Sequence, residues 1–303
     1  PSLVTDGPES AVEALAQAFE NILELTSTPL TLVRAVGLDT PGPASALGVI
    51  SSKGSTNFSQ VSWHGFDIRG ALEARIGLPV VYNNDANAAA LYAHHRHFGD
   101  AAMDTSSVSA IVGTGMGGGV VENGKVISGA AGMAGELGHV QIPLHDVLED
   151  GQPVPLCNCG FAGDVESIAS LTGIKKNLLP YWLGRFPDHP LAAEPVAKAA
   201  KLLRGYGEKE DPLALAVFGQ QAKALGKLFT IAANFTDPAA YLLGGGVVEA
   251  APKFRQWFLN TVRENTQLRA EQQAVANFAL VADLDMAGAR GAAVAALENV
   301  AAA

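Results

Sequence analysis

Short polar motifs in this chain stand at the ends of apolar strands and in glycine-rich turns, where sites are commonly built. The first is Asn84-Asp85, between a predicted buried strand and a predicted helix. Open α/β sheets bind ligands at the carboxyl ends of their strands. A carboxylate there can take a proton from a substrate hydroxyl while the neighbouring amide binds another hydroxyl. The alternative is that the Asn or Asp only caps the helix.

Two glycine runs could bring the backbone close to a ligand. Gly113-Thr-Gly-Met-Gly-Gly-Gly119 follows an apolar strand, and its glycines and its threonine hydroxyl suit an anion such as phosphate. It is neither a Walker loop nor a dinucleotide fingerprint, because no Gly-Lys-Ser/Thr follows and the next element is a strand. Gly244-Gly245-Gly246 permits approach of a flat ligand such as a nucleobase. Tight packing explains both runs equally well.

A third group of polar residues surrounds two cysteines. Glu136 and His139 are three residues apart and can point at one ligand. Cys157 and Cys159, together with His139 and Asp164, could supply a tetrahedral zinc set of one imidazole, two thiolates and one carboxylate. Two reduced structural cysteines are the alternative. Glu166 begins a predicted helix, where a lone carboxylate usually offsets the helix dipole.

The elements around the first motif alternate between strand and helix, which predicts parallel strands with helical crossovers. A capping box at Ser10 and Glu13 predicts an opening helix. A lobe with only two strands offers a helix little sheet to pack on, so this first lobe, residues 1–105, is expected to be incomplete as given. The predicted strands are 32–37 and 78–82, and the predicted helices are 66–76 and 85–98.

The second predicted lobe, residues 106–289, begins with a strand at 107–112 and an Asn123-Gly124 hairpin turn. Asp211-Pro212 predicts the start of a long helix, with an N-cap followed by proline in the first turn. The closing helix is expected at 288–300, with residues 290–303 packing back on the first lobe. The other predicted elements are helical pieces at 165–171, 174–183, 196–204 and 252–263, and strands at 241–243 and 278–282.

Composition narrows the class of protein. The chain has 303 residues, enough for two lobes with separate cores, and 48% of them are hydrophobic. No apolar run reaches the roughly 18 residues that a membrane span needs, so no membrane association is expected. The formal charge of −10 argues against a nucleic-acid partner. With no secretory leader visible and only two cysteines, the cytoplasm is the expected compartment.

Taken together, the motifs resemble the ROK family of sugar kinases and repressors, whose fold is the two-lobe, actin-like (ribonuclease H-like) α/β ATPase fold. The match spans most of the chain. It rests on the two glycine runs and on five further motifs: Gly37-Leu-Asp-Thr-Pro-Gly-Pro43, Asn84-Asp-Ala-Asn-Ala-Ala-Ala90, Asn123-Gly-Lys125, Gly135-Glu-Leu-Gly-His139 and Cys157-Asn-Cys-Gly-Phe-Ala-Gly-Asp-Val-Glu166.

The resemblance implies an ATP-dependent hexose kinase, most simply a glucokinase, which uses Mg²⁺ with ATP and forms a homodimer. Asp85 would be the general base. Asn84, Glu136, His139 and Glu166 would bind sugar hydroxyls. Thr114 and Gly115 would hold the ATP phosphates, with Gly245 and Gly246 along the adenosine. Such a role is physically sensible because phosphoryl transfer depends mainly on positioning and charge neutralisation.

Two departures from the family pattern are expected to matter. Family members begin with a strand and an Asp-x-Gly-Gly-Thr turn that contacts phosphate and magnesium, and no such motif precedes Ser10. We expect the natural protein to carry that segment, with three further strands. Asp164 stands where zinc-binding members have a third cysteine, and a carboxylate should weaken a zinc site.

Several alternatives stay open on the sequence alone. One is a sugar-responsive repressor whose DNA-binding module lies upstream, although the acidic charge and the retained Asp85 argue against it. Another is a protein that binds sugar without catalysis. The identity of the sugar, and ATP versus polyphosphate as the donor, are also open.

Overall fold

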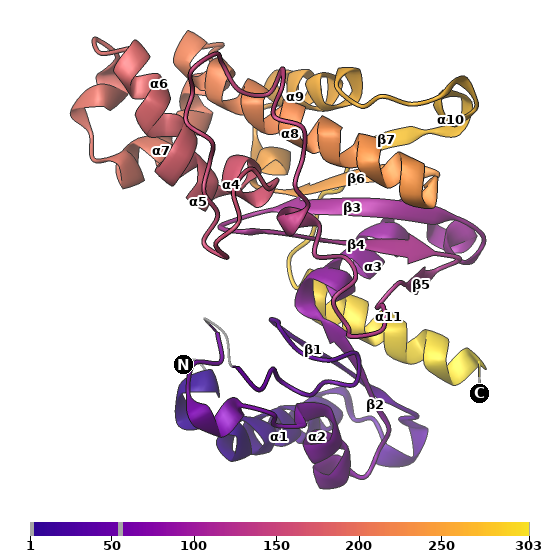
Figure 1. The fold of residues 1–303 in the computed structure, drawn as a ribbon. Helices are drawn as coiled ribbons and strands as arrows, with labels where there is room; N and C mark the ends of the chain where they lie inside the picture. Colours follow the sequence, from indigo (N-terminus) through magenta and orange to yellow (C-terminus); the bar gives the residue numbers. More distant parts are fainter. Residues whose placement is uncertain (1–2, 54–56, 303) are drawn as a thin grey trace.

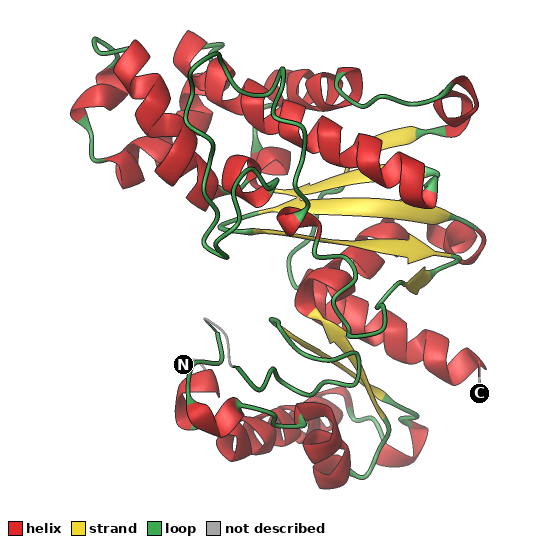
Figure 2. Cartoon of the chain, in the orientation of Figure 1, coloured by secondary structure: helices red, strands yellow, loops and turns green. Residues whose placement is uncertain are grey.

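Two lobes face each other across the middle of the molecule in the computed structural model, which describes residues 3–53 and 57–302 (Figure 1). The lower lobe in that view is built on a two-stranded sheet and the upper lobe on a five-stranded sheet. The helices lie around the two sheets (Figure 2). In the described ranges, no helix is both long and apolar enough to cross a membrane.

The first lobe is a parallel pair of strands with helices packed on it. Its elements are α1 (Pro8–Thr26), β1 (Val36–Thr40), α2 (Ile68–Ile76) and β2 (Val80–Asn84). Val36 pairs with Val80 and Thr40 with Asn84, so both strands end at the same edge. Apolar residues of α1, α2 and the segment between β1 and α2 fill the core, among them Ala16, Leu72 and Trp63.

The second lobe carries the sheet order β5-β4-β3-β6-β7. β3 is antiparallel to β4 and parallel to β6, and β6 is parallel to β7. The strands are β3 (Ser106–Val112), β4 (Met116–Glu122), β5 (Lys125–Val126), β6 (Ala240–Gly245) and β7 (Asn277–Leu280), and the helices are α4 (Glu166–Ala169), α5 (Leu171–Gly173), α6 (Leu179–Arg185), α7 (Val196–Gly207), α8 (Pro212–Thr236), α9 (Pro252–Glu264) and α10 (Ala270–Val275).

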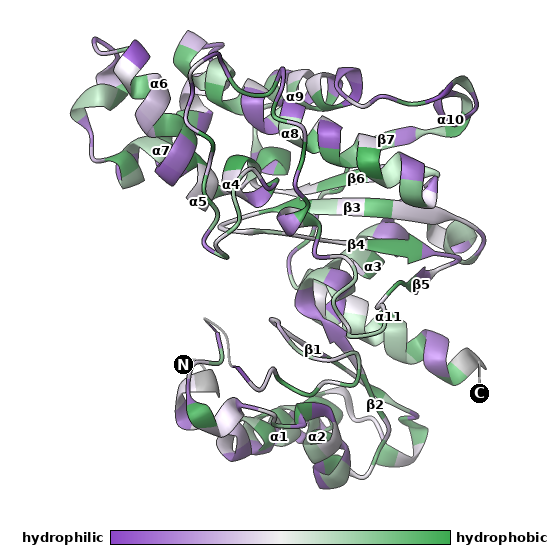
Figure 3. Ribbon diagram, in the orientation of Figure 1, coloured by the Kyte–Doolittle hydropathy of each residue, from purple (hydrophilic) through white to green (hydrophobic). Residues whose placement is uncertain are grey.

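Alternating side chains of β6 contribute to two cores on opposite faces of this sheet. Tyr241 and Leu243 belong to the large core formed with α8 and α9. Ala240 and Leu242 pack with Ala93 of α3 (Asp85–Phe98) on the other face. Because side chains point to opposite faces with a period of two, a strand buried on both faces is apolar at every position. The apolar stretches of the sheet and of α8 are green in Figure 3.

The last helix, α11 (Ala287–Ala302), connects the end of the chain to the first lobe. It packs along α3 and against β1 and β2, and Figure 1 shows it beneath α3. Two glycines allow this close approach, because a Cβ at Gly37 would meet the backbone of Ala292 and one at Gly291 would meet the carbonyl of Ala88. α3 also packs on β3 and β4, so it contacts both sheets.

Most predicted elements are present, with some shifted ends. α3 begins and ends where predicted, and Asn123 and Gly124 both have positive φ, as a tight hairpin turn requires. Asp211 caps α8 by accepting a hydrogen bond from the Ala214 amide, 3.0 Å away. The helical pieces at 165–171 and 174–183 are α4 and α5, then a π-helical turn at Ile174–Leu178 and α6.

Two sequence-based predictions were wrong, and one helix was missed. The Ser10 capping box does not form, because α1 begins at Pro8 after Gly7, with no side-chain cap. The first strand lies four residues further along than predicted, and residues 30–32 form a short 3₁₀ turn instead. α10 was not predicted at all; its short run, Ala270–Val275, has too few turns to show a helical period.

Candidate active site

A cleft of about 870 Å³ separates the lobes, and most of the predicted sugar-site residues line it. The first lobe and the start of α3 contribute one wall, and the glycine-rich turn and the segment around Glu136 contribute the opposite wall. The segment before α11 closes one end. The cleft brings together Asn84, Asp85, Gly115, Glu136, His139 and Glu166.

Asn84 and Asp85 lie where β2 ends and α3 begins. Asn84 caps the helix, because its Oδ1 accepts hydrogen bonds from the Ala86 amide at 2.9 Å and the Asn87 amide at 3.4 Å. Its Nδ2 lies beside Gly42, close to where a Cβ at that glycine would stand. The capping role and a binding role are therefore compatible, since the cap uses the amide oxygen and leaves the Nδ2 donor unpaired within the described ranges.

Asp85 is held at the first position of α3. Its Oδ1 accepts a hydrogen bond from the Ala86 amide at 2.7 Å, while no partner within the described ranges occupies Oδ2. Burial raises the pKa of this carboxyl above its ordinary value. A raised pKa makes the carboxylate a stronger base, and the free oxygen is available to a substrate hydroxyl.

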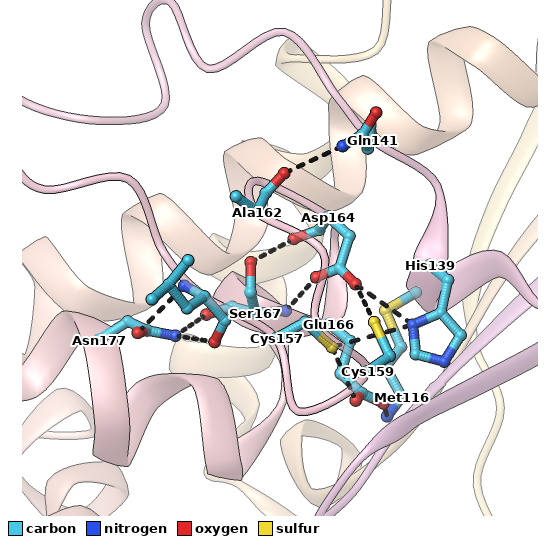
Figure 4. A network of polar contacts seen from close by, with 11 residues as sticks. Met116, His139, Gln141, Cys157, Cys159, Ala162, Asp164, Glu166, Ser167 and Asn177 are labelled. Carbon is cyan, nitrogen blue, oxygen red and sulfur yellow. Dashed lines mark hydrogen bonds and ion pairs between the residues drawn. The ribbon is translucent and has the colours of Figure 1, made fainter.

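Three side chains from two segments face Asp85 across the cleft. Glu136 makes no side-chain hydrogen bond within the described parts of the chain, and burial raises its pKa. Glu166 is fixed from both sides, because Oε2 accepts from the Met116 amide at 2.9 Å and Oε1 accepts from the Cys157 thiol at 3.5 Å. His139 directs Nδ1 at Asp164, which leaves Nε2 for a ligand (Figure 4).

The glycine-rich turn carries hydrogen-bond donors that have no acceptor in the described chain. The carbonyls of Gly113 and Thr114 accept hydrogen bonds from the Leu171 and Thr172 amides at 3.0 and 3.1 Å. These bonds tie the turn to α5. The amides of Thr114 and Gly115 and the Thr114 hydroxyl have no acceptor in the described chain. Exposed, unpaired backbone amides in a fixed turn are what an anion site requires.

A second, more apolar pocket of about 350 Å³ adjoins the cleft at Gly113. Thr114 and Gly246 line this pocket as well, whereas Gly115 lines the cleft. Gly245 lines neither. It has φ of +95°, and a Cβ there would collide with the Val112 carbonyl, so packing explains this glycine. Aromatic residues form much of the wall: Phe218, Phe254 and Phe258.

The cysteine cluster lies directly behind the sugar side of the cleft. One ligand atom each from His139, Cys157, Cys159 and Asp164 fits within 4.8 Å of the others. Asp164 is fully buried, and its Oδ1 accepts from the Ser167 amide at 2.8 Å. Figure 4 shows its carboxylate between Ser167 and the His139 ring. The donor set suits zinc, which takes imidazole, thiolate and carboxylate ligands.

Comparison with known protein families shows to which family this chain belongs. The sequence model of the ROK family matches residues 4–299. The chain belongs to the ROK family. This confirms the resemblance seen in the sequence, and the two-lobe actin-like ATPase fold is confirmed by similar solved ROK structures.

Several proteins similar to this chain are named as sugar kinases. A glucokinase of Halalkalibacterium halodurans is 35% identical over 63% of this chain and 56% of its own length. The ROK hexokinase of Thermus thermophilus has a TM-score of 0.76 at 31% identity, covering 100% of this chain and 90% of that one. A Streptomyces griseus ROK glucokinase, solved with glucose and AMPPNP, has a TM-score of 0.68 at 25% identity, covering 96% and 89%.

Other similar proteins act on a different sugar or are named as transcriptional regulators. An N-acetyl-D-glucosamine kinase of Vibrio atlanticus is 31% identical over 79% of this chain and 74% of its own length. A ROK transcriptional regulator, a homologue of an E. coli protein, has a TM-score of 0.69 at 24% identity, covering 95% of this chain and 68% of that one. That likeness shows the fold alone.

Sequence reasoning missed one acidic residue of this ROK cleft. Asp39 ends β1 beside the end of β2, and burial and the Asp85 charge raise its pKa. Its carboxylate lies against Gly288, at the start of α11. The parallel register of β1 and β2 was the missing information, because two strand ends that share an edge bring their next polar residues together.

Proposed function

We propose that this ROK protein transfers the γ-phosphoryl group of a nucleoside triphosphate to a hexose hydroxyl, most simply that of glucose. One observation carries the proposal. Asp85, with a free carboxylate oxygen, shares a cleft with Glu136, His139 and Glu166, and that cleft adjoins an apolar pocket through the glycine-rich turn.

The chemistry follows from this placement. Asp85 takes the proton of the sugar hydroxyl as the hydroxyl oxygen attacks the γ-phosphorus. The bond between the γ-phosphorus and the bridging oxygen breaks, and the nucleoside diphosphate leaves. Asn84, Glu136, His139 and Glu166 bind the other hydroxyls and hold the attacking one near Asp85. The free amides of Thr114 and Gly115 stabilise the negative phosphates. Partial burial raises the pKa of both Asp85 and Glu136, which makes each carboxylate a stronger acceptor for a hydroxyl proton.

Magnesium suits the acidic end of this cleft. Asp39 offers a carboxylate beside the strand end that carries Asp85, and a carboxylate is the ligand type that Mg²⁺ takes alongside phosphate and water. When bound with the nucleotide, the ion neutralises phosphate charge.

The apolar pocket favours a nucleotide over polyphosphate as the donor. A polyphosphate chain has no apolar part to fill a pocket walled by Phe218, Phe254 and Phe258. A nucleobase does, and its flat ring matches aromatic walls. Glucose is proposed as the sugar because several relatives carry the name glucokinase.

We also propose that His139, Cys157, Cys159 and Asp164 bind a structural zinc ion. Such an ion would fix Nδ1 of His139 and the loop that carries Glu166. The homodimer and the cytoplasmic location expected from the sequence stay predictions.

An assay of hexose phosphate formation across a hexose panel tests the function, because both candidate donors give that product. Glucose, mannose, fructose, N-acetylglucosamine and N-acetylmannosamine are each offered with ATP or with polyphosphate. We expect glucose with ATP to give the highest kcat/KM. Turnover with none of these sugars, alongside tight sugar binding by calorimetry, would favour the non-catalytic sugar-binding alternative.

A further inference from the structure

Two adjacent buried glutamines on α8 differ in how their amides are satisfied. Gln220 is 3% exposed and Gln221 is 5% exposed. Gln220 has partners for both amide atoms: Nε2 donates to Gln152 at 2.6 Å, and Oε1 accepts from Trp182 at 2.9 Å. Gln221 has a partner for only one, since its Nε2 donates to the Ala169 carbonyl.

The amide atom of Gln221 without a hydrogen-bond partner is Oε1, and it is exposed to solvent in the apolar pocket. Oε1 has no hydrogen-bond partner in the described chain, and it is not one of the unpaired atoms sealed from solvent. Gln221 lines the pocket and is otherwise buried, so solvent reaches Oε1 through that pocket. The carbonyl of Ala169 can only accept, which fixes Nε2 toward it and Oε1 away from it.

An acceptor fixed in an apolar pocket discriminates between bases. A buried polar atom that meets no donor from the ligand loses its water without replacement, which costs about 1–3 kcal/mol. A ligand acceptor placed opposite it adds repulsion. Among purine bases, adenine presents an exocyclic amine at C6, whereas hypoxanthine and guanine present a carbonyl oxygen at the same position.

We propose that Gln221 selects the base of the phosphoryl donor by accepting a hydrogen bond from the amine at C6 of adenine, which 6-oxopurines replace with a carbonyl oxygen. This rests on the proposed nucleotide-dependent function and adds a specificity residue to it. Phe218 and Phe254, with ring centroids 5.1 Å apart, and Phe258 supply the apolar walls that exclude water around that bond. Exclusion of water makes the bond more selective.

The test is nucleotide binding measured by calorimetry without sugar, so that it does not depend on catalysis. The wild-type protein is titrated with ATP, ITP and N6,N6-dimethyl-ATP. ITP exchanges the amine for a carbonyl, and the dimethyl analogue keeps nitrogen but has no N–H. We expect ATP to bind about 10- to 100-fold more tightly than either analogue.

Two variants locate the effect. Gln221→Met keeps the side-chain length without the acceptor, and it should reduce the ATP preference over ITP to about threefold or less. Gln220→Met is the matched control, expected to lower stability while leaving the ATP-to-ITP ratio unchanged. The binding of ATP and its two analogues to the wild-type protein still tests the proposal if a variant does not fold.

Each outcome separates the inference from the proposed function. Equal affinity for ATP and ITP, in a protein that phosphorylates hexose with ATP, would overturn the role of Gln221 and leave the function standing. A ratio that survives Gln221→Met would also overturn it. Absence of binding by every nucleotide would overturn both.

Discussion

Nδ1 of His139 lies 3.2 Å from Oδ2 of Asp164, so a fully buried carboxylate holds the ring whose other nitrogen is left for the cleft. Asp164 lies outside the cleft itself. If the proposed function holds, it is a positioning residue, which acts on the sugar through His139.

Replacing this carboxylate should affect sugar binding more than chemistry. Asp164→Asn keeps the shape of the side chain but removes its charge, so the His139 ring is held less firmly. We expect KM for the sugar to rise about 10- to 100-fold, with kcat changed less. Steady-state kinetics provides the measurement. A fall in kcat at unchanged KM would show that Asp164 does not act through sugar binding.

The zinc proposal is tested by strengthening the site. Asp164→Cys replaces a carboxylate with a thiolate, a softer ligand better suited to zinc. We expect the variant to retain close to one zinc per chain through dialysis against a chelator that strips the wild-type protein. Elemental analysis gives the ratio, and the Cys157→Ser variant is the control that should bind least. Equal zinc loss from wild type and Asp164→Cys would contradict the proposed ligand set.

The stability of the protein should depend on pH through Asp39, which lies near the Asp85 charge. Burial first, and then the Asp85 charge, raises the pKa of Asp39. The folded chain then binds more protons than the unfolded chain between the ordinary aspartate pKa and the raised value, so stability falls as pH rises through that window and the loss persists above it. Asp39→Asn should raise Tm at neutral pH, with a gain that shrinks toward acid pH.

The same Asp39→Asn variant should leave the acid side of the turnover profile where it is. Asp85 must be ionised to act as the base, so activity is lost on the acid side as it is protonated. Burial is what raises the pKa of Asp85, and the Asp39 charge does not contribute to it. A kcat/KM profile whose acid limb moves to lower pH in Asp39→Asn would contradict this, as would a Tm gain that is equal at every pH.

Two neighbouring glycines have different roles: Gly245 is required by packing, and Gly246 borders the apolar pocket. A Cβ at Gly246 meets nothing within 4 Å, whereas one at Gly245 collides with the Val112 carbonyl. Gly246→Val should leave Tm nearly unchanged but weaken ATP binding about 10- to 100-fold by filling the pocket. Gly245→Val should destabilise the fold by about 2 kcal/mol or more, since its φ is also positive. Normal ATP affinity in Gly246→Val would place the base elsewhere.

The sequence predicted elements whose signals are local. α3 and the Asn123-Gly124 hairpin follow from capping and turn residues within a few positions. β1 was misplaced because its extent is set by pairing with β2, more than 40 residues away, and local hydrophobicity continues upstream of it. Long-range pairing of this kind leaves no local signal.

The sequence pointed to polar residues that the structure places in one cleft, but not to their hydrogen-bond geometry. The sequence indicated Asn84 as either a cap or a ligand; the structure shows it capping α3 with its amide donor still free. Gln221 was not predicted, because a glutamine within a long helix gives no sign that one amide atom is fixed and the other faces a pocket.

The central claim is tested most directly by the single substitution Asp85→Asn, measured for both turnover and sugar binding. The control is Asp67→Asn, which changes another aspartate at a helix start, one that caps α2 away from the cleft. We expect Asp85→Asn to reduce kcat by at least about 10²-fold, because general-base catalysis contributes about 10²–10⁴-fold. Sugar affinity by calorimetry should stay within about threefold, and Asp67→Asn should keep normal kcat. Turnover near the wild-type rate in Asp85→Asn would contradict the assignment of Asp85 as the base.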